Sequence, residues 1–277
     1  MSSNNISLHF LEEHPIDAAR TLEQFAPEDL AAYLENIPTD TAASVLKYIV
    51  PTMATECLKN MSLEKSSPII VQMGVERASL LLRRMKSGLR VQLIRTMSPV
   101  FANMTRLVLR YPEGTVGHVM NPNVFTVHED MTVEEVIKVI KSSSELSHNE
   151  IFITGDKQQL LGIVDIRYLI TENDQKPMSK IMQPAGECLP ARSSLASVIN
   201  LAEWNKRENL PVVDHFGVFI GVLRRSVIHD YQSGRHTSHE HVEFAGTALA
   251  VAELFWDACI NLLAPDYENE KKGQEDE

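Results

Sequence analysis

Apolar residues recur at every twelfth position through the first third of the chain. Leu22 and Phe25 each begin such a series, and both series continue without a slip as far as Ile94 and Met97. A third series, mostly of small residues, begins at Ala19. Residues spaced three and six apart fall on one side of a helix of two turns. The pattern therefore predicts one short helix in each repeat, about eight residues long, followed by a turn.

Prolines and a glycine separate these repeats. Pro15, Pro27, Pro38 and Pro51 stand at the junctions, where a proline in the first helical turn loses no hydrogen bond, and Gly74 breaks a later repeat. Helices this short are not stable alone in water, so we expect them to stack into a superhelix of about seven to eight members. The alternative is an irregular helical bundle with accidental spacing. The methionines that close the later repeats are expected in the core, not in a metal or cofactor site.

From Val116 the pattern changes to strands mixed with helices, and it occurs twice. The letters VMNP, from Val119, recur as IMQP from Ile181. Each copy predicts a strand, a helix, two strands and a final helix over about 60 residues. In the first copy, Thr132 and Glu135 are predicted to form a capping box, in which each side chain accepts from the backbone N–H of the other. The predicted fold class is α+β: an all-α superhelix, a tandem β-α-β-β-α pair and a C-terminal helix.

The C-terminal helix is predicted over residues 241–264. Its apolar residues are spaced three and four apart over three heptads, which is typical of a coiled-coil seam. We do not expect it to span a membrane, because Glu253 and Asp257 stand near the middle of the apolar run. We expect this helix to pack in a homodimer. Residues 265–277 form an acidic tail that we expect to be disordered, and the histidines between 236 and 241 are expected in a polar linker.

Composition and charge narrow the function. The chain has 277 residues, of which 44% are apolar and 23% charged, as in ordinary folded proteins. Its net charge is -11, which argues against nucleic-acid binding and leaves cations and basic proteins as partners. Three widely spaced cysteines predict no disulfide framework and favour a reducing, cytoplasmic location. None of the common catalytic motifs is present, so we do not expect an enzyme.

These motifs resemble those of a known family. The stretches MTVEEVI, GIVD, LPVVD and GVFIGVL look like parts of a tandem pair of cystathionine-β-synthase (CBS) domains. With the helical repeats and LRYPEGTVGHVM, they resemble the cytosolic part of MgtE-type magnesium transporters. The resemblance implies an MgtE N-like superhelical domain over residues 14–112 and CBS domains over 116–174 and 177–232. In that family a transmembrane channel domain follows the CBS pair, and we expect the present chain to lack it.

The resemblance implies a regulatory magnesium sensor. In the family, Mg²⁺ ions bridge acidic faces of the superhelical domain and the CBS pair and stabilise a compact state that closes the pore. Clustered carboxylates repel one another until a hard cation neutralises them, and Mg²⁺ keeps most of its waters while it does so. A homodimer joined by the CBS pair would then regulate a separate membrane channel or another protein. The candidate metal ligands are five carboxylates: Glu113, Asp130, Glu134, Asp165 and Asp214.

An adenine nucleotide is the alternative ligand, because CBS pairs also resemble modules that bind nucleotides between their copies. The usual signature has a ribose-binding Asp six residues after a glycine, but Tyr168 and Val227 stand at those positions. Arginines nevertheless suit bidentate pairing with phosphates. A scaffold that holds a protein partner without any small ligand is the third interpretation. The candidate nucleotide-binding residues are Asp165, Arg167, Arg224 and Arg225.

Overall fold

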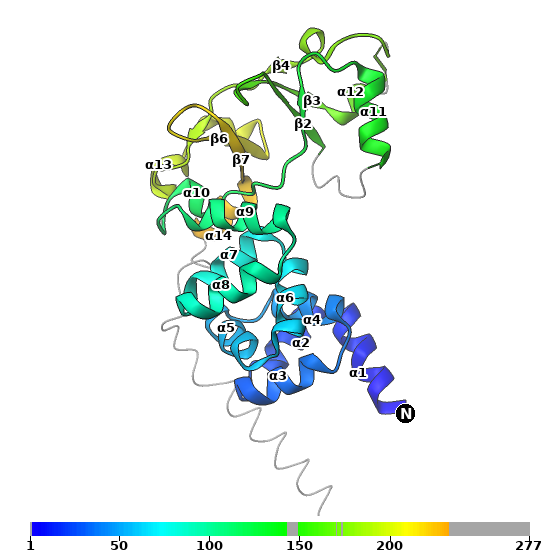
Figure 1. The fold of residues 1–277 in the computed structure, drawn as a ribbon, viewed down its shortest axis with the longest axis vertical. Helices are drawn as coiled ribbons and strands as arrows, with labels where there is room; N and C mark the ends of the chain where they lie inside the picture. The colour runs from blue at the N-terminus through cyan, green and yellow to red at the C-terminus, as the bar shows by residue number, and fades with distance from the viewer. Residues whose placement is uncertain (1, 143–148, 170, 173, 233–277) are drawn as a thin grey trace, which may run out of the picture. The chain divides into compact units, whose positions relative to one another are not determined.

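The structure is a computed structural model that describes residues 2–142, 149–169, 171–172 and 174–232. Residues 1–232 belong to one compact unit. This unit is α+β, as predicted, with helices first and two small sheets after them (Figure 1). The predicted C-terminal helix, the acidic tail and the histidines between 236 and 241 lie outside the described residues.

Short helices follow one another through the first domain. An additional helix, α1, precedes the repeats, and α2 to α9 follow the repeat as predicted. Most pack against the helix two places further along, as α3 does on α5 and α4 on α6 (Figure 1). Their bounds are α1 (Ser2–Glu13), α2 (Pro15–Leu22), α3 (Pro27–Glu35), α4 (Thr39–Leu46), α5 (Pro51–Asn60), α6 (Leu63–Gln72), α7 (Val75–Arg84), α8 (Ser87–Thr96) and α9 (Pro99–Leu109).

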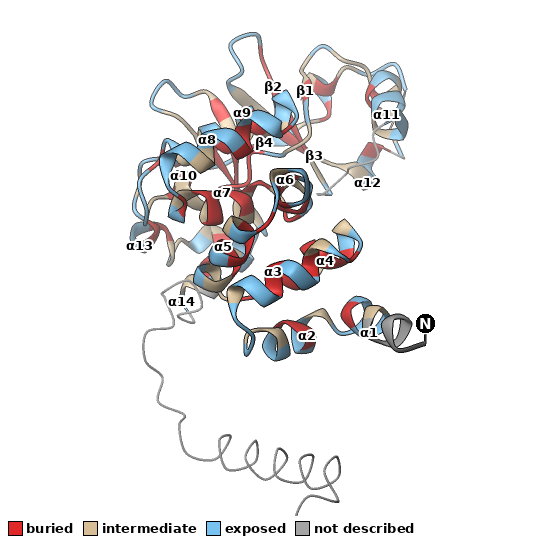
Figure 2. Ribbon diagram, turned by 60° about the horizontal axis from the view of Figure 1, so that its bottom comes forward, coloured by how far each residue is buried: buried red, intermediate tan, exposed pale blue. Residues whose placement is uncertain are grey.

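The repeated apolar positions form the core of this stack. The buried sides of the helices face their neighbours in Figure 2. Two predicted core positions are wrong: Phe25 is 52% exposed and Val91 is 45% exposed. Phe25 lies in the turn between α2 and α3, and Val91 lies on α8. The buried members of the two main series include Leu34, Ile37, Leu46, Ile49, Leu58, Met61, Ile70, Met73, Leu82, Met85, Ile94 and Met97.

Two β-α-β-β-α copies follow, as predicted. The capping box is present, because Thr132 N–H donates to Glu135 Oε2 at 2.8 Å and Glu135 N–H donates to Thr132 Oγ1 at 3.3 Å. The first copy contains β1 (Thr126–His128), α11 (Val133–Ser142), β2 (Glu150–Thr154), β3 (Leu160–Asp165) and α12 (Ile166–Leu169). The second contains β5 (Leu189–Pro190), α13 (Leu195–Val198), β6 (Asn209–Val213), β7 (Phe219–Arg224) and α14 (Arg225–Gln232). Shorter elements are α10 (Val116–Val119) before the first copy, η1 (Met178–Lys180) and β4 (Gln183–Pro184) between the copies, and η2 (Ala202–Asn205) within the second.

The two copies exchange their leading segments. Strand β4 precedes the second copy but pairs with β3 of the first copy. In return, Asn121, which precedes the first copy, pairs with Val222 in β7 of the second. Glycines permit both crossings, since a Cβ on Gly162 would lie 2.7 Å from the Gln183 carbonyl oxygen and one on Gly221 would lie 2.5 Å from that of Asn121. The exchange joins the copies into one folded pair.

Candidate functional site

Asp130, one of the five candidate metal ligands, is open to solvent. It follows β1, and its carboxylate is 85% exposed. The Nδ1 atom of His128 lies 3.5 Å from Asp130 Oδ2. The other ring nitrogen of His128 lies 3.1 Å from Asp156 Oδ1. The imidazole therefore stands between two carboxylates at the end of the strand.

Glu134 lies in the first turn of α11 and already has partners. Its Oε1 lies 2.6 Å from Lys138 Nζ, one turn further along the helix. Its Oε2 accepts a hydrogen bond from Gln175 Nε2 at 3.2 Å. The hydrogen bond and charge of Lys138 lower the pKa of Glu134 below its usual value. A cation that binds here must compete with Lys138.

Asp165 and Arg167 neutralise each other at the end of β3. The guanidinium of Arg167 donates to both oxygens of Asp165, and its backbone N–H donates to Oδ1 at 2.9 Å. These bonds hold the pKa of Asp165 below its usual value. The two groups, each a candidate for nucleotide binding, thus form one ion pair.

Glu113 and Asp214 each influence the pKa of a residue near the end of the helical domain: Glu113 that of Arg83, and Asp214 that of Tyr111. Asp214 Oδ1 accepts from the backbone N–H groups of Phe216 and Val218, which closes the turn between β6 and β7. Burial raises the pKa of Tyr111, and the charge of Asp214 adds to this effect. Glu113 is exposed, and its charge partly offsets the burial that lowers the pKa of Arg83.

The five carboxylates do not converge on one point. Within the described ranges, no group of three or more His, Cys, Asp or Glu side chains is placed so that it could hold a metal ion. Mg²⁺ binds through one or two carboxylates and its own waters, so the assignment of these residues as metal ligands stays a prediction.

Arg224 and Arg225 lie where β7 passes into α14, and both pair with carboxylates. Arg224 Nη2 lies 3.0 Å from Glu76 Oε2, on α7 of the helical domain. Burial raises the pKa of Glu76, and the Arg224 charge opposes the rise. Arg225 Nη1 lies 3.5 Å from Glu208 Oε1. A phosphate at Arg224 would have to displace Glu76.

Sequence reasoning missed this contact between the helical domain and the second CBS copy. The ring of Tyr111 packs on Gly117, where a Cβ would lie 2.4 Å from the Tyr111 Cγ. Arg83 Nη2 donates to the carbonyl oxygen of Tyr111 at 2.9 Å. Val75 and Val108 share one apolar cluster with the second CBS copy. Tyr111 and Gly117 belong to a recognisable motif, but nothing in its spacing shows what they touch.

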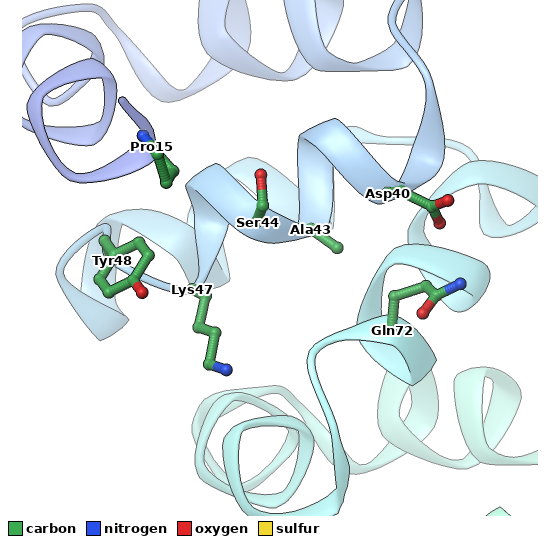
Figure 3. A pocket seen from close by; sticks show the side chains of 7 residues that line it. All are labelled: Pro15, Asp40, Ala43, Ser44, Lys47, Tyr48 and Gln72. Atoms are coloured by element: carbon green, nitrogen blue, oxygen red, sulfur yellow. The ribbon is translucent and has the colours of Figure 1, made fainter. Parts of the chain in front are cut away.

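The helical domain has a shallow pocket on its surface. The pocket has a volume of about 270 Å³. Figure 3 shows Asp40 and Gln72 toward one end of α4 and Lys47 and Tyr48 toward the other. The charge of Lys47 also acts on Glu76, where it opposes the rise in pKa that burial causes. The pocket is lined by Pro15, Asp40, Ala43, Ser44, Lys47, Tyr48 and Gln72.

Comparisons with known proteins agree with this architecture. Residues 13–114 match the MgtE intracellular N domain, and residues 116–173 match the CBS domain. Magnesium transporter MgtE from Thermus thermophilus is 27% identical over 134 residues, which make up 48% of this chain and 30% of that relative. The match therefore spans less than a third of the length of that relative. In the described part of the chain, no helix is long and apolar enough to cross a bilayer.

Two solved structures share the fold. One is the cytosolic domain of the Mg²⁺ channel MgtE in complex with ATP, with a TM-score of 0.71 and 24% identity, covering 81% of this chain and 93% of that one. The other is the soluble part of a magnesium transporter, with a TM-score of 0.60 and 14% identity, covering 84% of this chain and 97% of that one. The chain therefore consists of an MgtE intracellular N domain followed by a CBS domain and a second copy of the same fold, the domain organisation of MgtE-type cytosolic regions.

Proposed function

We propose that this chain is a non-catalytic regulatory module of magnesium transport that binds Mg²⁺. The observation that carries the proposal is the match of residues 13–114 to the MgtE intracellular N domain, together with a shared fold over 93% of a solved MgtE cytosolic domain. We place the module in the cytoplasm, where it would regulate a membrane channel or another protein partner.

The ligand would act by electrostatics. Mg²⁺ prefers oxygen ligands and dehydrates reluctantly, so one or two carboxylates and bound waters suffice to hold it. Asp130 is a well placed candidate, because its carboxylate is 85% exposed and its ion-pair partner among the described residues is His128, not a Lys or Arg. Glu134 begins the helix that follows and would serve as the second carboxylate. Glu113, Asp165 and Asp214 are the remaining candidate ligands.

Ligand binding would be read out as movement of the helical domain relative to the CBS pair. A ligand shifts such an equilibrium only by as much as it prefers one arrangement. The contact that movement would break is the joint formed by the ion pair of Glu76 with Arg224 and by the apolar cluster that Val75 and Val108 share with the second CBS copy. We propose that Mg²⁺ changes the strength of this joint.

Calorimetry of the whole chain tests the proposal. We expect heat on addition of millimolar Mg²⁺, and we expect the double variant Asp130→Asn with Glu134→Gln to lose it. The matched control is Asp29→Asn with Glu64→Gln, which makes the same charge change on the helical domain and should keep the signal. Absence of Mg²⁺ binding to the wild-type chain would refute the proposal. Equal loss in both variants would refute the assignment of the site.

A nucleotide is the second candidate ligand, favoured by the arginines that follow β3 and β7 and by the shared fold with an MgtE domain solved with ATP. Its phosphates would compete with Asp165 for Arg167 and with Glu76 for Arg224. Heat on addition of ATP or AMP without Mg²⁺, lost in Arg224→Ala, would support this function over the first. If neither Mg²⁺ nor either nucleotide gives a heat of binding, the interpretation as a ligand-free scaffold for a protein partner would remain.

We also propose a homodimer, joined by the CBS pair and by the helix predicted over residues 241–264. The seam of apolar residues in that helix supports the proposal. Removal of the residues after His241 should convert the dimer into a monomer, which light scattering measures as the mass in solution. A truncated chain that still has the mass of a dimer would exclude this helix as a dimer element.

A further inference from the structure

The helical domain carries an unusual concentration of positive charge. Residues 77–112, which we call the basic band, contain eight Arg and Lys residues and no Asp or Glu. Residues 1–76 contain eleven Asp and Glu against four Lys and Arg. The net charge of -11 for the whole chain hides this separation. The basic band covers α7, α8 and α9 and ends at Pro112.

Most of these cations face solvent without a counter-ion. The exposed ones carry no ion pair to any side chain that the structure describes; Arg106 donates only to the amide oxygen of Asn103, at 3.1 Å. Burial lowers the pKa of Arg77 and of Arg83, and the like charges of Arg84 and Arg90 lower the two values further. The exposed cations are Arg84, Lys86, Arg95, Arg106 and Arg110.

Like charges held close together without carboxylates between them weaken the folded state. The neighbouring repeats show that the fold accepts acids at solvent positions, since Glu28, Asp29 and Glu56 are exposed on earlier helices. The stack does not need this run of cations for its own stability. An anionic partner would explain it.

Exposed aliphatic residues accompany the cations. Val100 is 66% exposed and lies on α9, two turns before Arg106; Val91 is 45% exposed and lies one turn before Arg95. The two aromatic residues of the band, Phe101 and Tyr111, are not exposed, so no base-stacking platform for nucleic acid exists there. Exposed cations mixed with aliphatic side chains are the composition of surfaces that bind anionic lipid.

A second copy of the chain fits less well as the partner. A two-fold dimer could place the acidic residues 1–76 of each copy against the basic band of the other, but it would not account for the exposed aliphatic residues Val91 and Val100. A membrane surface presents anionic headgroups and apolar acyl chains together, which matches both kinds of exposed side chain. We propose that the basic band on α7, α8 and α9 binds the anionic phospholipid surface of a membrane. This inference does not depend on magnesium binding.

Sedimentation with vesicles tests the inference on the whole chain. We expect binding to vesicles of phosphatidylcholine with phosphatidylserine, weakened by salt, and no binding to phosphatidylcholine alone. The triple variant Arg84→Glu, Arg95→Glu and Arg106→Glu has one change on each helix. Its affinity for these vesicles should fall at least about a hundredfold, because each cation near an anionic surface contributes roughly 1 kcal/mol.

The control variant is Lys157→Glu, Lys180→Glu and Lys206→Glu, which makes the same charge change at exposed positions of the CBS pair. It should bind as the wild type does, and circular dichroism should show that both variants are folded. Equal loss in the two variants would overturn the inference, as would a wild-type chain that ignores both kinds of vesicle. Binding to soluble polyglutamate without binding to vesicles would assign the band to an acidic protein instead.

Discussion

Glu35, the last residue of α3, stabilises the start of α6, which lies three helices further along the chain. Its Oε1 accepts from the backbone N–H of Ser62, the N-cap of α6, at 2.6 Å. Glu23 makes the same bond one repeat earlier, to Val50 N–H at the start of α5. Neither N-cap side chain caps its own helix, so the carboxylates supply acceptors that the helix N-termini need.

Replacement of Glu35 by Ala should lower the midpoint of thermal unfolding. The hydrogen bond from Ser62 N–H lowers the pKa of Glu35 from 4.5 in the folded state. A group with a lowered pKa stabilises the fold fully above its unfolded pKa, and the stabilisation is lost as the pH falls through the folded value. The difference between wild type and variant should therefore be present at neutral pH and vanish in acid. Gln24→Ala, which removes an exposed uncharged side chain, is the control and should show no such pH dependence.

At the scale of elements, two glycines decide whether the CBS copies can exchange their leading segments. Gly162 in β3 faces the carbonyl of Gln183, and Gly221 in β7 faces that of Asn121. Gly221 also has a φ of 152°, in a region that residues with a Cβ rarely adopt. The same two glycines stand at the first position of the nucleotide-binding signature in the sequence. In the structure, each is needed because the backbone of the other copy's leading segment passes close to it.

We expect Gly221→Ala and Gly162→Ala each to reduce the free energy of unfolding by about 1 to 3 kcal/mol, because backbone must move to admit the new Cβ. Gly88→Ala is the matched control, since no atom lies within 4 Å of its Cβ position; it should be neutral or slightly stabilising. Urea unfolding followed by circular dichroism measures all three. Losses no larger than that of the control would show that the crossings are looser than described.

Local patterns predicted the elements well and their contacts poorly. The twelve-residue repeat and the capping box of Thr132 with Glu135 depend on residues close in sequence, and both are confirmed. The strand exchange and the pairing of Glu76 with Arg224 join segments far apart in sequence. No periodicity records such pairs. The sequence identified carboxylates as candidate metal ligands. It did not predict that some of them, such as Glu134, already form an ion pair, in this case with Lys138.

At the scale of the whole unit, the helical domain and the second CBS copy share an apolar cluster and one ion pair. The pair of Glu76 with Arg224 is partly exposed, with side-chain exposures of 31% and 40%. Its net contribution should be small, about 1 kcal/mol, because water screens it. Its value lies in fixing which faces of the two domains meet.

Reversal of one charge, as in Glu76→Arg, should place two guanidiniums together and loosen the joint. The double variant Glu76→Arg with Arg224→Glu restores opposite charges and should recover compactness. Small-angle X-ray scattering of each variant measures the effect as a change in radius of gyration. A double variant as expanded as the single one would show that the apolar cluster alone, or the order of the charges, decides the docking.

The exchange of leading segments also sets the order in which the nascent chain can acquire its structure. Each helix of the stack meets partners only a repeat or two away, so the helical domain can assemble as its repeats leave the ribosome. The sheet of the first CBS copy takes its fourth strand from residues 183–184, and Asn121 waits for Val222. The first copy therefore lacks one strand until the start of the second copy has been synthesised, and its leading segment stays unpaired until β7 of the second copy is present. The pair should therefore appear late in translation, as a single cooperative step.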